Sequence, residues 1–146
     1  MRRTRPNGAK NQLELERFCE KEGSGIYLIR LYTPQSQHAN VTNVADYILF
    51  ANKVIILEVK ETGADSFSTR TMQQKEELEE YKKFYSSAVA LYTHLPYRAV
   101  VLVHFIRKGK YTAYFIDEGE FVVMHPDDDN CLTADSLPEI MEKILQ

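Results

Sequence analysis

Two apolar segments separated by three residues restrict most strongly how this chain can fold. Residues 44–50 and 54–59 are rich in β-branched side chains, and Ala51-Asn52-Lys53 between them has the length of a hairpin turn. The sequence therefore predicts an antiparallel β-hairpin.

The remaining pattern predicts one mixed sheet with helices outside it. Residues 99–106 are almost continuously apolar, which is typical of a strand covered on both faces. Ser136 and Glu139 have the spacing of a capping box at the start of a last helix. The expected elements are helices over 11–22, 70–91 and 136–145 and strands over 25–32, 44–50, 54–59, 99–106 and 111–116, with 120–124 a candidate for one more. The expected fold class is α/β, in the order α-β-β-β-α-β-β-α.

Length and composition are those of one globular domain in a reducing compartment. With 146 residues, 44% of them hydrophobic and 27% charged, the chain has none of the bias of a disordered or coiled-coil sequence. No apolar stretch reaches the roughly 18 residues of a membrane span, and no apolar segment follows the N-terminal charges as in a secretory signal. Cys19 and Cys131 are too few for a disulfide scaffold or a four-cysteine zinc site. We expect a cytoplasmic protein, of a cell or of a virus in its host, without membrane contact.

The charges are distributed unevenly along the chain. Residues 1–10 carry four basic and no acidic residues, whereas residues 117–146 carry nine acidic residues and one basic residue. We expect 1–10 to be a basic flexible arm and 11–146 a single domain, in which 117–146 is an acidic C-terminal extension ending in a helix. This layout fits a body that faces a polyanion, although the sequence pI of about 5.8 is below that of many DNA-binding domains. The alternative is a basic disordered start and a solvated acidic end without nucleic-acid binding.

Three charged residues interrupt the apolar hairpin. Glu58 and Lys60 are two positions apart, so they project from the same face of a strand. A three-residue turn places Asp46 directly opposite Glu58, whereas a two-residue turn would put Asp46 on the other face. If instead the strand ends at Leu57, Glu58 and Lys60 lie on the surface.

A metal ion would explain the paired carboxylates. Like charges opposite each other destabilise a sheet, so Asp46 opposite Glu58 makes sense chiefly when a cation lies between them. Two carboxylates, the carbonyl of Val59 and waters are the oxygen ligands that Mg²⁺ prefers. Lys60 would then lower the pKa of an attacking water or stabilise the anion that develops at a phosphate.

At these residues the sequence resembles the PD-(D/E)xK nuclease superfamily, whose hallmark is an Asp on one strand and Glu-x-Lys on the next, here Asp46 and Glu58-Val59-Lys60. Within the superfamily the chain is most similar to the Holliday-junction resolvases of archaea, Gram-positive bacteria and their viruses, over residues 7–116. The resemblance implies a restriction-endonuclease-like fold and a homodimer that binds branched DNA. It also implies hydrolysis of four-way junctions with Mg²⁺, for which Mn²⁺ substitutes.

The resemblance also assigns roles to residues on two helices. The family's second helix presents a glutamine, which matches Gln74 and implies a residue that orients water near the metal or contacts phosphate; the alternative is a surface glutamine on an amphipathic helix. The family's first helix often has a metal-linked glutamate four residues after a glycine, and this chain has Gln12 there. Glu14 or Glu16 could substitute by a shift along the helix, or a water could make the contact.

Basic residues at the N-terminus and on the first strand are the candidate phosphate contacts: Arg2, Arg3, Arg5, Lys10 and Arg30. Phosphate contacts supply affinity and salt dependence without reading sequence, which suits recognition of branched shape. Two alternatives stay open. One is another PD-(D/E)xK DNA nuclease, acting in restriction, repair or cleavage of forks and flaps. The other is a catalytically silent DNA-binding or assembly module of the same fold.

Overall fold

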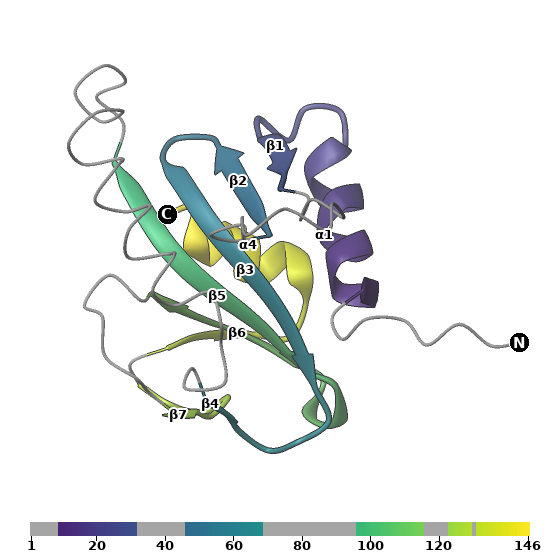
Figure 1. Cartoon of the computed structure of the whole chain (residues 1–146), viewed down its shortest axis with the longest axis vertical. Helices are drawn as coiled ribbons and strands as arrows, with labels where there is room; N and C mark the ends of the chain where they lie inside the picture. The colour runs from purple at the N-terminus through teal and green to yellow at the C-terminus, as the bar shows by residue number, and fades with distance from the viewer. Residues whose placement is uncertain (1–8, 32–45, 69–95, 116–122, 130) are drawn as a thin grey trace, which may run out of the picture.

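The computed structural model describes residues 9–31, 46–68, 96–115, 123–129 and 131–146, which form a mixed α/β arrangement with helices on a six-stranded sheet (Figure 1). The helices of these ranges are α1 (Ala9–Glu20), α4 (Leu137–Ile144) and the short 3₁₀ helix η3 (Ile106–Lys108). The strands of the main sheet are β1 (Tyr27–Arg30), β2 (Tyr47–Phe50), β3 (Val54–Thr62), β5 (Tyr97–Phe105), β6 (Lys110–Phe115) and β8 (Leu132–Ala134). A second, two-stranded sheet pairs β4 (Phe67–Ser68) with β7 (Val123–Met124).

The main sheet is built around two long central strands. Its strand order is β1-β2-β3-β5-β6-β8, with β3 and β5 parallel and every other neighbouring pair antiparallel. Both central strands are nine residues long and mostly buried. A strand with both faces covered cannot alternate apolar and polar residues, which explains why these two segments read as almost continuous apolar runs.

Each face of the sheet has its own apolar cluster. On one face, Leu15 of α1 and Ile140 of α4 pack together with alternate residues of the strands. On the opposite face, Ile48 and Ile56 belong to a second cluster that Met124 of β7 completes. Figure 1 shows α4 behind the sheet and the β4–β7 pair at its lower end. Both described α-helices therefore lie on one side of the sheet.

The structure confirms the expected elements over most of the described ranges. β3 continues through Glu58 and Lys60 to Thr62, so the alternative in which this strand ends at Leu57 is wrong. The Ser136 side chain accepts a hydrogen bond from the Glu139 N–H at 3.3 Å, as the capping-box spacing predicts for the start of α4. The expected helix over 70–91 lies outside the described residues.

The sequence does not predict two of the short strands, β4 and β8. β8 lies in the acidic C-terminal segment and pairs with β6, where Ala134 is opposite Tyr111. α4 follows it and packs on the core. Strands of two or three residues are too short to show a periodic pattern, and they form because a partner strand is available. The acidic segment thus supplies one edge of the main sheet and one of its covering helices.

Within the described ranges, no helix has the length and apolar character that crossing a membrane requires.

The central position of β5 can be tested at Leu102, which is fully buried. Leu102→Ala should lower the free energy of unfolding by about 2–5 kcal/mol, because it removes apolar contacts and leaves a cavity. Ile106→Ala, at a side chain that is 49% exposed, should change it by less than about 0.5 kcal/mol. Urea denaturation of both variants gives the comparison, and equal effects would contradict the buried placement of β5.

Candidate functional site

The turn between β2 and β3 determines where Asp46 lies. Phe50 pairs with Val54, so the turn has the three residues that the sequence predicts. Asp46 immediately precedes β2, and its N–H donates to the Leu57 carbonyl at 3.0 Å. The paired register ends at Tyr47 and Leu57, and the Asp46 carboxylate reaches β3 at the residue that follows Glu58.

The Asp46 carboxylate lies against the edge of β3. Its Oδ2 accepts a hydrogen bond from the Val59 N–H at 2.8 Å. Because the N–H and C=O of one strand residue point to the same side, the Val59 carbonyl faces the edge on which Asp46 lies. Two of the three proposed metal ligands are therefore adjacent.

Glu58 places a carboxylate inside the sheet, where it is only 1% exposed. Its Oε1 lies 3.0 Å from Lys60 Nζ, whereas its Oε2 is buried with no hydrogen-bond partner in the part of the chain that is described. Burial raises the pKa of Glu58 to about 7, and the charge of Asp46 adds to the rise while Lys60 opposes it. Near neutral pH, Glu58 is thus close to its titration midpoint and has one oxygen without a partner.

The side chains of Glu58 and Lys60 belong to the face of the sheet opposite α1 and α4. Residues two apart in a strand share a face, so Glu58 and Lys60 point to the same side as Ile56. Asp46 precedes β2 and contacts β3 through its carboxylate, at the Val59 N–H. Ile48 and Ile56 both belong to the cluster on the face that α1 and α4 do not cover.

This set of donors fits a hard divalent cation. The carboxylates of Asp46 and Glu58 repel each other, and a bound cation would remove this repulsion and give Glu58 Oε2 a partner. Across the described ranges, no group of three or more His, Cys, Asp or Glu side chains is placed to hold a metal. A bound Mg²⁺ would have the Asp46 and Glu58 carboxylates and the Val59 carbonyl as protein ligands, and Mg²⁺ commonly keeps several of its waters in protein sites.

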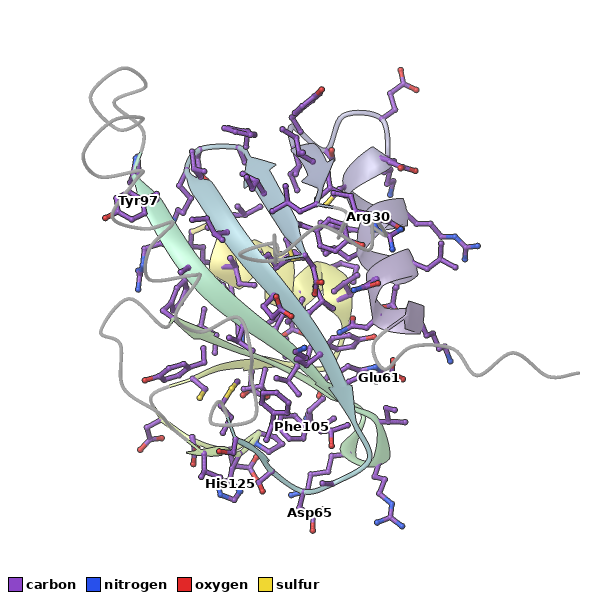
Figure 2. All side chains as sticks on the ribbon, in the orientation of Figure 1. Arg30, Glu61, Asp65, Tyr97, Phe105 and His125 are labelled. Atoms are coloured by element: carbon purple, nitrogen blue, oxygen red, sulfur yellow. The ribbon has the colours of Figure 1, made fainter. Side chains whose placement is uncertain are left out.

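The structure places several of the other candidates on or beside α1. Arg30 lies on the face that carries the helices, with its Nη1 3.3 Å from Glu16 Oε1 (Figure 2). Lys10 is exposed in the first turn of α1, and Gln12 is half-buried. Arg2, Arg3, Arg5 and Gln74 lie outside the described residues.

Glu14 connects α1 to β6. Its Oε1 and Oε2 accept the Tyr111 hydroxyl at 2.8 and 3.0 Å. Burial, followed by this hydrogen bond to Glu14, raises the pKa of Tyr111 well above its usual value. The Tyr111 ring also stacks on His104, with the ring centroids 4.2 Å apart. A role for Glu14 in place of the first-helix glutamate stays a prediction.

One residue that the sequence analysis does not single out contacts the strand of the site. Asn11 is fully buried in α1, and its Nδ2 donates to the carbonyl of Lys60 at 3.1 Å. Asn11, Leu15 and Cys19 are four residues apart, so Asn11 is a polar residue in the buried stripe of the helix. That interruption is the signal in the sequence that could have identified it.

No known protein-family model matches this chain, and no curated protein sequence matches it either. The case for a function therefore depends on the residues and geometry of the site.

The buried carboxyl group makes stability depend on pH. In buffer without divalent cations, Glu58→Gln should raise the free energy of unfolding at pH 8 by about 1–3 kcal/mol. The folded protein binds a proton on Glu58 more tightly than the unfolded chain does, so the wild type loses stability as pH rises from 4.5 to about 7. Glutamine cannot ionise and escapes this loss.

Urea denaturation from pH 4 to pH 8 measures the effect. The gain should disappear below pH 4.5, the ordinary pKa of the group. The matched control is Glu142→Gln on the exposed side of α4, expected within about 0.5 kcal/mol of the wild type. A gain of equal size at pH 4 and pH 8 would contradict a raised pKa at Glu58.

Proposed function

We propose that this protein is a metal-dependent DNA endonuclease of restriction-endonuclease-like architecture, and that it resolves four-way junctions. One observation carries the proposal: the Asp46 carboxylate accepts the N–H of Val59, the residue between Glu58 and Lys60, and Glu58 Oε2 is buried without a partner among the described residues. A buried charge with an unused oxygen destabilises a fold, and a site that binds a cation accounts for its presence. The element order α1-β1-β2-β3, followed by β5 and β6, agrees with this architecture.

The same residues fit the hydrolysis of a phosphodiester. Mg²⁺ held by Asp46, Glu58 and the Val59 carbonyl would supply Lewis acidity and lower the pKa of water. Lys60 contributes a positive charge that stabilises the negative charge developing on the phosphate oxygens. Water attacks phosphorus in line, and its O–P bond forms as the P–O3′ bond breaks. A proton passes to the leaving oxygen, which gives a 3′-hydroxyl and a 5′-phosphate.

Basic side chains lie beyond the C-terminal end of β3, the end nearest to Lys60. Thr62, the last residue of β3, is opposite Phe105, so the exposed Arg107 and Lys108 of η3 follow at this end of the sheet. Lys10, exposed at the start of α1, is next to Asn11, which contacts the strand at Lys60. Contacts from these side chains to phosphates would give affinity that does not depend on base sequence. Such affinity is what a nuclease selective for DNA shape needs.

Resolution of a junction also requires two chains. A symmetric pair of cuts needs two active sites, and one chain contributes one Asp46–Glu58 pair. A homodimer with two-fold symmetry supplies the second site and mirrors the symmetry of a four-way junction. Branched DNA and a second copy of the chain are therefore the proposed partners.

A cleavage assay tests the enzyme assignment. Asp46→Asn and Glu58→Gln should each lower the cleavage rate with Mg²⁺ or Mn²⁺ by at least about 100-fold while DNA binding is retained, because they remove charge from the metal ligands. EDTA should abolish cleavage by the wild type. Asp65→Asn is the matched control, because Asp65 is an exposed carboxylate in the loop beyond β3 (Figure 2) and should leave the rate unchanged.

Two outcomes would contradict the proposed enzyme or its site. Wild type that binds DNA but cuts no substrate with either metal would be a silent binding module, and equal loss in Asp65→Asn would mean that the site is elsewhere.

A panel of DNA shapes tests the proposed substrate. Four-way junctions should be cut at least about 10-fold faster than linear duplex, forks or flaps, and sedimentation should show a dimer. Mixed dimers of wild type and Glu58→Gln should nick one strand of a junction without resolving it. Faster cleavage of forks or flaps would mean that the protein is a nuclease with the same mechanism but a different DNA substrate.

A further inference from the structure

Asn11 is a polar residue where the packing of α1 calls for an apolar one. It begins the stripe that Leu15 and Cys19 continue, and these three side chains are 0%, 0% and 3% exposed. The stripe packs on the face of the sheet that includes Leu57 and Val59. A leucine at position 11 would bury apolar surface there, whereas an amide must find partners for its donor and its acceptor.

Only half of this requirement is met in the described part of the chain. Asn11 Nδ2 donates to the Lys60 carbonyl at 3.1 Å, and Asn11 Oδ1 is buried with no hydrogen-bond partner in these ranges. A buried acceptor without a partner lowers stability. The Asn11 amide therefore lowers the stability of the fold, and its one hydrogen bond to Lys60 is the contact that can explain its presence.

The hydrogen bond acts on the part of β3 that extends past its pairing with β2. The pairing of β2 with β3 ends at Tyr47 and Leu57, so within the described ranges β5 alone continues beside Lys60, through Val103. The Asn11 amide is an additional tether on this part of β3. It holds the peptide of the residue whose Nζ lies 3.0 Å from Glu58.

α1 is itself anchored one turn further along. Glu14 accepts the Tyr111 hydroxyl of β6 at 2.8 Å, which fixes the helix to a second strand of the sheet. Asn11 thus transmits the position of an anchored helix to the backbone of Lys60, through the sheet and from the face opposite the site.

We propose that Asn11 is a positioning residue, which fixes the backbone of Lys60 so that the ammonium group is held toward the Asp46–Glu58 pair. This inference rests on the proposed nuclease function, because the effect of Lys60 is on the phosphate. It explains why an amide is kept at a buried position that an apolar side chain would fill more stably. Misplacement of a charged group by about 1 Å can cost up to about 100-fold in rate, so one tether can matter for catalysis.

Two variants remove the donor with opposite effects on stability. Asn11→Leu removes the unpaired acceptor and should leave Tm at or above that of the wild type. Asn11→Asp keeps the shape, loses the donor and buries a charge, so it should lower Tm. Both should lower kcat for junction cleavage by at least about 10-fold, while KM for the junction changes less than about twofold.

The matched control is Leu15→Ala, one turn further along the same stripe. It leaves a cavity under α1 and should lower Tm, yet it leaves the amide on Lys60 and should keep kcat within about twofold of the wild type. Hydrogen exchange of residues 58–62 gives a readout that needs no activity, and it should be faster in Asn11→Leu than in Leu15→Ala.

Each result decides a separate point. Unchanged kcat in Asn11→Leu, or an equal loss of kcat in Leu15→Ala, would overturn the positioning role while cleavage by the wild type upholds the proposed function. Wild type without cleavage would refute both the proposed nuclease function and the positioning role of Asn11 in cleavage. Hydrogen exchange would then still show whether Asn11 restrains β3.

Discussion

The three-residue turn between β2 and β3 is the constraint on which the candidate site depends. A register shift of one residue would change which residue of β3 the Asp46 carboxylate meets. The observed pairing of Phe50 with Val54 brings Asp46 to the part of β3 that contains Glu58 and Val59. The hydrogen bond from the Val59 N–H to Asp46 then holds the carboxylate at the edge of β3, just before the start of β2. A feature of a few turn residues thus decides whether two carboxylates can cooperate.

The burial of the Glu58 carboxylate lowers the stability of the fold. The surrounding strands carry apolar side chains on both faces, and Lys60 partners only one oxygen of the carboxylate. Local rules of packing are usually broken where a protein has a function to perform. Asn11 repeats this pattern on the other face of the same strand, since it too has a buried oxygen without a partner in the described ranges. Both residues contact Lys60: Glu58 contacts its ammonium group, and Asn11 contacts its backbone carbonyl.

Much of the architecture could be predicted from local sequence, because its main strands and helices carry strong periodic or apolar patterns. The hairpin, β5 and the capped start of α4 all follow from such patterns. β8 could not be predicted, since three residues hold no period and the strand exists through its pairing with β6. The sequence likewise contains no signal that Glu14 would accept the Tyr111 hydroxyl, a contact between residues 97 positions apart.

The sequence by itself determined the hairpin and the shared direction of Glu58 and Lys60 along one strand, because strand geometry converts spacing directly into direction. The tertiary structure alone decided how deeply Glu58 is buried, that its pKa is raised, and which residue of α1 reaches Lys60. Burial and long-range contact arise when helices and distant strands pack on both faces of β3. Such packing depends on the fit of whole surfaces, which local periodicity does not specify.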